Sequence, residues 1–332
     1  MTTSSVSGCG RATDVSAPRR TVGDVRRLSP LMDAIIPPGA EVEVLAEGFD
    51  WAEGPVWVED GGYLLFTDVP QNVIWRWSEA DGLAEFMRPS GFDGVDGSHL
   101  REPGANGLAI EAAGTLLMCD HGNRSLSRVD LAVREKTIVV DRFEGRRFNS
   151  PNDLVIAADG SVYFTDPPYG LEGLNDSPVR ELSHNGVYRL APDGRVALLD
   201  ASLSFPNGLA LSPDQRTLYV AVSDPEGPVV MAYDLNEDGL PVSSRVFFDA
   251  APLMGPDAPG LPDGMKVDPQ GRIFATGPGG VLVLSPEGEL LGVIDAGRAV
   301  ANCAFGPGGA GLFLAADDVL ARVALHPAGR LR

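Results

Sequence analysis

The stretch that decides the fold is residues 149–170, Asn-Ser-Pro-Asn-Asp-Leu-Val-Ile-Ala-Ala-Asp-Gly-Ser-Val-Tyr-Phe-Thr-Asp-Pro-Pro-Tyr-Gly. It contains two short apolar runs, 154–157 and 162–165, that are separated by an Asp-Gly pair. An Asp-Gly pair between apolar runs is a strong signal for a β-hairpin. Because a hairpin brings its two ends together, we expect Asn152 and Asp166 to lie near each other.

The polar start of this hairpin recurs along the chain at steps of 39 to 56 residues. Each copy opens one apolar strand, passes through a turn and returns in a second apolar strand. Third and fourth strands follow in most copies, such as 187–190 and 196–199. Repeats of about 40–50 residues with four strands each are typical of β-propellers. The six polar tips are Glu53, Asn106, Asn152, Asn207, Asp263 and Asn302.

The sequence therefore predicts an all-β fold, a six-bladed β-propeller with four antiparallel strands in each blade. Only three clear strands follow the last tip, so we expect the N-terminal strand at 42–45 to complete that blade and close the ring. Closure would remove an exposed sheet edge. The predicted division is an N-terminal tail and short helical cap at 1–40, with the helix within 24–36, and a propeller at 41–332.

Composition narrows the class of protein. The formal net charge of −20 argues against nucleic acid and anionic membrane surfaces as partners. The sequence contains no run of about 18 or more apolar residues, so no membrane-spanning helix is predicted. The three cysteines, Cys9, Cys119 and Cys303, have no zinc-site spacing, and the last two are expected to be buried apolar side chains. The sequence leaves the oligomeric state open.

The N-terminal residues bear on localisation. We expect residues 1–20 to form a disordered tail and the protein to be cytoplasmic. The segment Val-Ser-Gly-Cys at 6–9 resembles a bacterial lipoprotein cleavage box, but no apolar region precedes it. Export to the periplasm or as a lipoprotein is the alternative if the natural start lies upstream.

The segment Gly-Pro-Gly-Gly-Ala-Gly at 306–311 matches the G-x-G-x-x-G dinucleotide motif. That motif requires the loop to open a helix, whereas here it leads into the apolar run 312–315. We interpret it as a hairpin turn. Neither G-x-S-x-G nor H-E-x-x-H occurs, so two common hydrolase chemistries have no support.

In a propeller the first strand of each blade lines the central channel, so the six tips should converge at one mouth. Two carboxylates and four amides suit Ca²⁺, which prefers oxygen ligands. Zn²⁺ prefers His or Cys, and neither occurs at the tips. The alternative is that Asn and Asp occupy these positions because they favour turns.

The ends of the second strands should rise to the same mouth. They carry Asp68, Asp120, Asp166 and Asp224. His121 follows one of these strands and is a candidate general base or ligand of substrate hydroxyls, the alternative being a structural loop histidine. We expect Asp166 and Tyr169 to contribute to a substrate-binding pocket.

Several segments together resemble the senescence-marker-protein/gluconolactonase/luciferin-regenerating family, over roughly residues 40–325. They are Glu53-Gly-Pro, 148–154, 164–170, 205–209 and 261–265. The resemblance implies a six-bladed propeller with one divalent ion in the channel. It also implies hydrolysis of sugar lactones, with paraoxonases as more distant relatives.

The resemblance also implies roles for individual residues. Glu53, Asn207 and Asp263 match the metal ligands of the family, and Asn152 matches a position that contacts metal or substrate. Asn106 and His121 match the bacterial gluconolactonase-like branch, and we expect both to contact substrate.

The resulting hypothesis is the opening of an aldonolactone, such as glucono-δ-lactone, to its acid. Ca²⁺, or alternatively Mg²⁺, Mn²⁺ or Zn²⁺, would act as Lewis acid on the carbonyl, with Asp263 or His121 as general base. The alternatives are an arylesterase or phosphotriesterase of paraoxonase type and a calcium-binding propeller without enzymatic activity.

Overall fold

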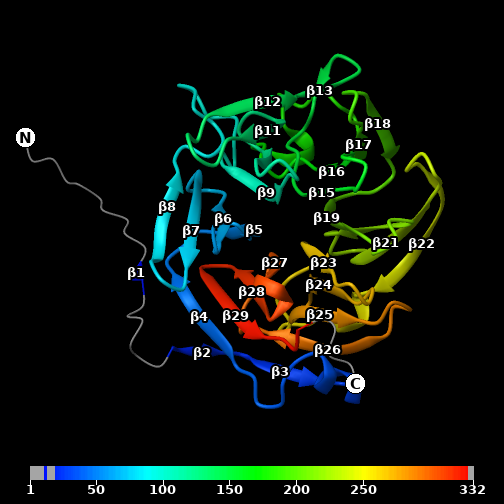
Figure 1. Ribbon diagram of the computed structural model, residues 1–332. Coiled ribbons are helices and arrows are strands. Elements are labelled where there is room, and N and C mark those ends of the chain that lie inside the picture. Colours follow the sequence, from blue (N-terminus) through cyan, green and yellow to red (C-terminus); the bar gives the residue numbers. More distant parts are fainter. Residues whose placement is uncertain (1–10, 13–18, 328–332) are drawn as a thin grey trace, which may run out of the picture.

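The computed structural model describes residues 11–12 and 19–327 and shows a ring of sheets around a central channel (Figure 1). The predicted six-bladed propeller is confirmed. The tail expected at 1–20 and the cysteine at position 9 lie largely or wholly outside the described residues. No helix in 11–12 or 19–327 combines the length and apolar character needed to cross a lipid bilayer.

Blades 1 to 4 are four-stranded antiparallel sheets built from consecutive strands. Blade 1 contains β5 (Ala52–Val58), β6 (Tyr63–Asp68), β7 (Val73–Ser78) and β8 (Gly82–Met87). Blade 2 contains β9 (Ala105–Ile110), β10 (Leu116–Asp120), β11 (Ser125–Val129) and β12 (Lys136–Val140), followed by the small hairpin β13 (Arg142–Phe143) and β14 (Arg146–Arg147). Blade 3 contains β15 (Leu154–Ile156), β16 (Val162–Asp166), β17 (Gly186–Leu190) and β18 (Val196–Asp200). Blade 4 contains β19 (Pro206–Leu211), β20 (Thr217–Val222), β21 (Val229–Leu235) and β22 (Pro241–Asp249).

Blades 5 and 6 include N-terminal strands. Blade 5 contains β23 (Met265–Val267), β24 (Ile273–Gly277), β25 (Gly280–Leu284), β26 (Leu290–Asp295) and, at its outer edge, β3 (Asp24–Arg27). Blade 6 contains β27 (Asn302–Phe305), β28 (Gly311–Ala316), β29 (Val319–Ala324) and β4 (Val42–Glu47), and β4 also pairs with β1 (Arg11–Ala12) and β2 (Thr21–Val22). The predicted closing strand is thus β4.

The helix expected within 24–36 is only partly correct. Asp24–Arg27 is a strand because the outer edge of β26 is available for pairing, with Val25 opposite Ile294. The helical part is the 3₁₀ turn η1 (Pro30–Ala34). Three further 3₁₀ turns are η2 (Leu174–Asp176), η3 (Ala251–Leu253) and η4 (Pro307–Gly309). The division of the chain at residue 40 stays a prediction.

The hairpin predicted within 149–170 forms in blade 3. Leu154 pairs with Phe164 and Ile156 with Val162. Gly160 adopts φ 83° in the turn, and its amide donates to the carbonyl oxygen of Ala157 at 2.9 Å. The left-handed backbone explains the glycine in the Asp-Gly pair. The glycine-rich segment before β28 is likewise the turn of an antiparallel hairpin with β27, as predicted.

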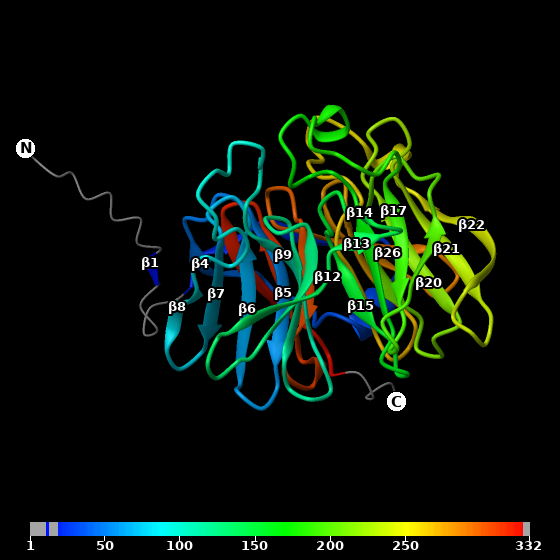
Figure 2. The same cartoon turned by 90° about the horizontal axis from the view of Figure 1, so that it is seen from above.

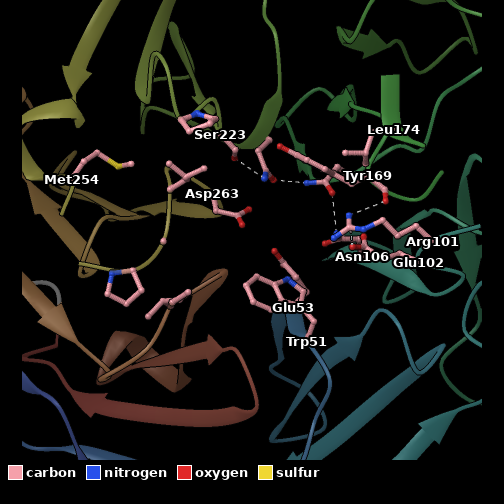
Figure 3. Close-up of a pocket in the computed structure, with 18 of the residues that line it drawn as sticks. Trp51, Glu53, Arg101, Glu102, Asn106, Tyr169, Leu174, Ser223, Met254 and Asp263 are labelled. Atoms are coloured by element: carbon pink, nitrogen blue, oxygen red, sulfur yellow. Dashed lines mark hydrogen bonds and ion pairs between the residues drawn. The ribbon is translucent and has the colours of Figure 1, made fainter. Parts of the chain in front are cut away.

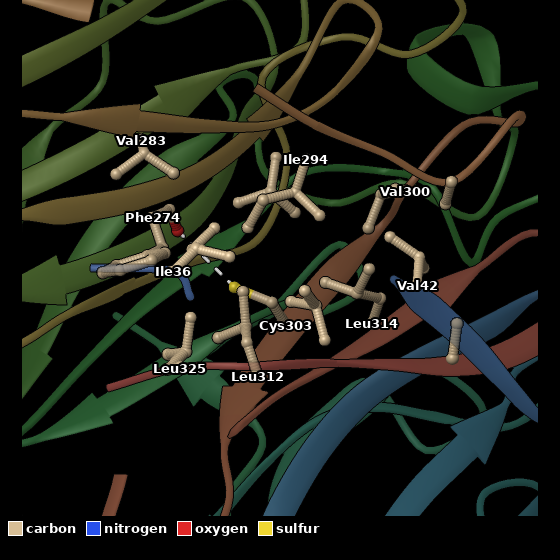
Figure 4. Packing of buried hydrophobic residues seen from close by; sticks show 14 of the residues in the cluster. Ile36, Val42, Phe274, Val283, Ile294, Val300, Cys303, Leu312, Leu314 and Leu325 are labelled. Carbon is tan, nitrogen blue, oxygen red and sulfur yellow. Dashed lines mark hydrogen bonds between the residues drawn. The ribbon is translucent and has the colours of Figure 1, made fainter. Parts of the chain in front are cut away.

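Apolar side chains fill the spaces between neighbouring blades. One cluster lies between blades 5 and 6 and takes Val42 and Val44 from the closing strand, each 1% exposed (Figure 4). Cys303 packs in the same cluster, with its Sγ 3.5 Å from the carbonyl oxygen of Phe274. Cys119 and Cys303 are both buried, as predicted.

Ring closure predicts a stability effect at β4. We expect Val44→Ala to lower the free energy of unfolding by about 2 kcal/mol, because it leaves a cavity among well-packed side chains. Equilibrium urea unfolding measures this. Glu41→Ala, at an exposed position just before the strand, is the control and should change stability by less than about 0.5 kcal/mol. Equal effects of the two variants would contradict the closing role of β4.

Candidate functional site

The first strands approach one another closely around the channel. In blades 1, 2, 4 and 5 a glycine follows the polar tip. A Cβ added at Gly208 would lie 2.2 Å from the carbonyl oxygen of Asp263, and one at Gly264 would lie 2.0 Å from Cγ of Asn302. These positions therefore exclude side chains, and the glycines allow neighbouring tips to share one small buried space.

Three of the tip amides form a hydrogen-bonded row. Nδ2 of Asn106 donates to Oδ1 of Asn152 at 2.9 Å, and Nδ2 of Asn152 donates to Oδ1 of Asn207. The row ends where Nδ2 of Asn207 donates to Oγ of Ser223 at 2.9 Å. All three asparagines are buried. The structure thus brings together Asn106, Asn152 and Asn207, as predicted.

The two tip carboxylates, Glu53 and Asp263, point into the same central space (Figure 3). Burial and the neighbouring Asp153 raise the pKa of Glu53 to about 7. Burial, together with repulsion from Glu53 and Asp153, raises the pKa of Asp263 well above its usual range. Oδ1 of Asp263 and Oδ1 of Asn106 are inaccessible to solvent and have no hydrogen-bond partner in the described structure. The site therefore holds repelling carboxylates and unsatisfied oxygen atoms.

The tips open into a cavity of about 760 Å³. Its polar wall is formed by Glu53, Arg101, Glu102, Asn106, Asn152, Tyr169, Asn207, Ser223 and Asp263. Its apolar wall includes Trp51, Leu174, Pro225, Met254, Leu261 and Val300. The mixed lining can hold a small molecule with hydroxyl groups on one side and apolar surface on the other.

Two long connections, 89–104 and 171–185, help to cover the cavity. Both rise from the same face of the ring (Figure 2). Leu100 and Leu171 form a β-bridge, and the amide of Glu172 donates to the carbonyl oxygen of His99 at 2.9 Å. The first connection contributes Arg101 to the cavity wall, and the second contributes Leu174 through η2. The two connections therefore form one hydrogen-bonded cover.

His121 is fully buried and lies behind the cavity wall rather than on it. Its Nε2 is 3.2 Å from Oδ1 of Asn152, and its Nδ1 is 3.4 Å from Oε2 of Glu102. Because Oδ1 of Asn152 is an amide oxygen and can only accept hydrogen bonds, Nε2 of His121 is the donor in this contact. This places His121 where it orients Asn152. Its predicted role as general base stays a prediction.

The structure separates Asp166 from the cavity wall. The backbone amide of Asn152 donates to the carbonyl oxygen of Thr165, the residue before Asp166. The carboxylate of Asp166 points toward Asn149 instead, and the backbone amide of Asn149 donates to Oδ2 of Asp166 at 2.8 Å. Burial raises the pKa of Asp166 to about 7, and its Oδ1 has no partner in the described structure. Tyr169, by contrast, lines the cavity and stacks on Phe205 with ring centres 5.8 Å apart.

The other second-strand carboxylates stabilise loops instead of ringing the mouth. Asp68 accepts the amide of Trp51, Asp120 pairs with Lys136 at 3.0 Å, and Asp224 accepts the amide of Glu226. None of these three carboxylates is part of the cavity wall. The expectation of a complete acidic ring is therefore wrong, because each carboxylate is already used by nearby donors.

The sequence did not predict the grouping of Asp153, Lys266 and Asn302 beside the tip carboxylates. Nδ2 of Asn302 lies 3.1 Å from Oε2 of Glu53 and 3.3 Å from Oδ2 of Asp153, and Nζ of Lys266 donates to Oδ1 of Asn302 at 3.2 Å. Burial raises the pKa of Asp153, and the Lys266 ammonium opposes this rise. One signal was available, because Asp153 occupies the position where most blades have glycine.

The donor set restricts which metal the site can hold. Within 11–12 and 19–327, no group of three or more His, Cys, Asp or Glu side chains is arranged to hold a metal ion. A cation here must therefore use amide oxygens beside the carboxylates. Amide and carboxylate oxygens are ligands of hard cations such as Ca²⁺.

The fold and the site define the class of this protein as a six-bladed β-propeller with carboxylates and amides at one channel mouth. The family described as SMP-30/Gluconolactonase/LRE-like region matches residues 51–316, and the chain belongs to this family. A gluconolactonase from Zymomonas mobilis is 42% identical over 97% of this chain and 91% of its own length. Regucalcin from Xenopus laevis is 26% identical over 74% of each chain.

Solved structures agree with this assignment. A gluconolactonase structure from Xanthomonas campestris is 31% identical, with a TM-score of 0.81 over 96% of this chain and 100% of that chain. A regucalcin structure from Agrobacterium tumefaciens, with 20% identity and a TM-score of 0.65 over 85% of this chain and 92% of that chain, shows the same fold. The family resemblance inferred from the sequence is confirmed.

The buried Asp166 predicts a pH dependence of stability. Because its pKa is raised on folding, the folded state binds more protons than the unfolded state between about pH 4 and pH 7. This residue should therefore lower the free energy of unfolding by up to about 4 kcal/mol as pH rises through that window. Asp166→Asn should remove this fall, as measured by chemical unfolding in chelator-treated buffer.

The control is Asp193→Asn. Hydrogen bonds from Arg195 lower the pKa of Asp193, so its removal should change the slope of stability against pH in the opposite sense. Identical slopes for the wild type and Asp166→Asn would contradict the burial effect.

Proposed function

We propose that this protein hydrolyses a sugar lactone, of the glucono-lactone type, to the corresponding acid. The observation that carries the proposal is the 42% identity with a gluconolactonase over nearly the whole chain. A pentonolactonase from Haloferax volcanii, 29% identical over 76% of this chain, supports the same reaction type. The expectation of a lactone hydrolase agrees with these relatives. The polar wall of the cavity suits a hydroxylated substrate.

The proposed cofactor is a divalent cation, Ca²⁺ by preference. Glu53, Asn152, Asn207 and Asp263 would hold it, since all four carry oxygen donors at the channel mouth. The repulsion that raises the pKa of both Glu53 and Asp263, after the effect of burial, would be relieved by a positive ion. When bound, the cation supplies Lewis acidity toward the lactone carbonyl oxygen.

The chain's own residues can perform the remaining tasks. Within the described residues 11–12 and 19–327, Oδ1 of Asp263 has no hydrogen-bond partner, so it can accept a proton from the attacking water. The water oxygen then bonds to the carbonyl carbon, the ring carbon–oxygen bond breaks, and the proton taken up by Asp263 passes to the released ring oxygen. Oδ1 of Asn106 can accept a bond from a sugar hydroxyl, and Oη of Tyr169 can donate one, since both residues line the cavity. His121 would keep the Asn152 amide in place.

The apolar wall of the cavity favours aromatic esters as a second substrate class. Leu174, Met254 and Leu261 give part of the cavity a surface suited to aromatic esters. An arylesterase activity would use the same carboxylates and the same cation. Comparing turnover of glucono-δ-lactone with that of phenyl acetate separates the two activities, and a preference for the lactone supports the proposal.

Removal of the metal tests the cofactor. Protein treated with a chelator should release no acid from glucono-δ-lactone above the spontaneous rate, and addition of Ca²⁺ should restore activity. The measurement is pH-stat titration with subtraction of a protein-free reaction, because this lactone also opens on its own. Full activity after complete metal removal would refute the cation.

Substitution of Asp263 tests the proposed base and ligand. We expect Asp263→Asn to lower kcat/KM at least about 100-fold, since both proton transfer and charge stabilisation depend on this carboxylate. Calorimetric Ca²⁺ affinity should fall in the same variant. Asp238→Asn, in the exposed turn between β21 and β22, is the control and should keep both values. Near-normal turnover by Asp263→Asn would exclude the assignment.

A further inference from the structure

The chain has only two lysines, Lys136 and Lys266, among its 26 basic Lys and Arg residues. Lys136 has a clear structural role, because its ammonium pairs with the buried carboxylate of Asp120 at 3.0 Å. Lys266 lies on β23, three residues beyond the tip Asp263, and is partly buried in the channel. Its position beside the proposed cation site calls for a separate explanation.

The side-chain amide of Asn302 links Lys266 to the carboxylates of the site. Nζ of Lys266 donates to Oδ1 of Asn302 at 3.2 Å and to its neighbour's carbonyl oxygen, Met265 O, at 3.0 Å. The opposite end of the Asn302 amide faces Oε2 of Glu53 at 3.1 Å and Oδ2 of Asp153 at 3.3 Å. The amide dipole is therefore aligned between an ammonium and two carboxylates. This arrangement keeps the ammonium close to the carboxylates without direct contact.

The proposed cation site is surrounded by several charged side chains. Glu53, Asp153 and Asp263 interact with one another as buried carboxylates. Glu102 also repels Asp263, but it has its own cation, since Arg101 lies 2.9 Å from its Oε1. When all groups are ionised, three carboxylates and the Lys266 ammonium carry a net charge of −2. A divalent cation would neutralise the group, whereas a trivalent cation would leave an excess positive charge in a buried site, which is costly.

We propose that Lys266 is a specificity-determining residue that sets the charge of the channel site to match a divalent rather than a trivalent cation. The inference rests on the cation-binding part of the proposed function and not on the identity of the lactone. The competing explanation is that Lys266 only fixes the Asn302 side chain.

The test compares the affinities of metal-stripped full-length protein for Ca²⁺ and Tb³⁺. Calorimetry gives the Kd for Ca²⁺, and Tb³⁺ luminescence gives the Kd for the trivalent ion. Lys266→Met keeps the length of the side chain and removes its charge, so the ratio Kd(Ca²⁺)/Kd(Tb³⁺) should rise at least about tenfold, the size expected for a unit charge close to the ion in a partly buried site. Lys266→Arg keeps the charge and should leave the ratio near the wild-type value.

A second variant makes the test independent of how well Lys266→Met folds. Asn302→Asp adds one negative charge at the same place and should move the ratio in the same direction. Thermal unfolding followed by circular dichroism verifies that each protein is folded. A purely structural role of Lys266 would weaken both ions equally, so an unchanged ratio in the folded variants would overturn the proposal.

The outcomes also separate this inference from the proposed function. Wild-type protein that binds neither ion would overturn both the cation site and the role of Lys266. If the wild-type protein binds Ca²⁺ and the variants show the predicted shift, but the wild-type protein does not hydrolyse lactones, the role of Lys266 would be retained and the substrate refuted.

Discussion

The close approach of the first strands around the channel is the constraint on which the rest of the structure depends. Glycines at positions such as Gly208 and Gly264 permit this approach, because any side chain there would collide with the neighbouring blade. The polar tips are consequently forced into one buried space. Their amides form hydrogen bonds with one another in a row from Asn106 to Ser223. The carboxylates of Glu53 and Asp263 instead repel each other, and Oδ1 of Asp263 has no hydrogen-bond partner among the described residues. The same packing that closes the ring thus creates a site that favours a cation.

Much of this arrangement was predictable because it follows from a repeated local pattern. The tips, the hairpins and the closing strand at 42–45 each follow from residues near in sequence, and the structure confirms them. The contacts that escaped prediction join different blades. Asn302 meets Glu53 across 249 residues of chain, and Lys266 reaches it from blade 5. The strand β3 was missed for the same reason, since the edge that it covers belongs to β26.

The directions in which side chains point were also not predictable from the sequence. The repeat placed Asp166 correctly at a strand end, but the amide of Asn149 draws its carboxylate away from the cavity. His121 was expected at the mouth and instead lies behind Asn152, held between that amide and Glu102. In both cases a neighbouring hydrogen-bond partner decides which way the side chain turns. The polar wall of the cavity is therefore supported by a second row of buried polar groups, which limits its freedom to rearrange.

The pairing of β4 with β29 joins two distant segments of the chain, with Glu43 opposite Arg322, which lies 279 residues later. Contacts of such long sequence separation form late, since a large loop must be closed before they can contribute. During synthesis from the N-terminus, the blades emerge in order, but the ring cannot close until β29 has left the ribosome. Carboxylates and amides from first and last blades therefore meet only in the finished chain. An incomplete chain has no assembled channel mouth, so ligand binding reports on completed folding.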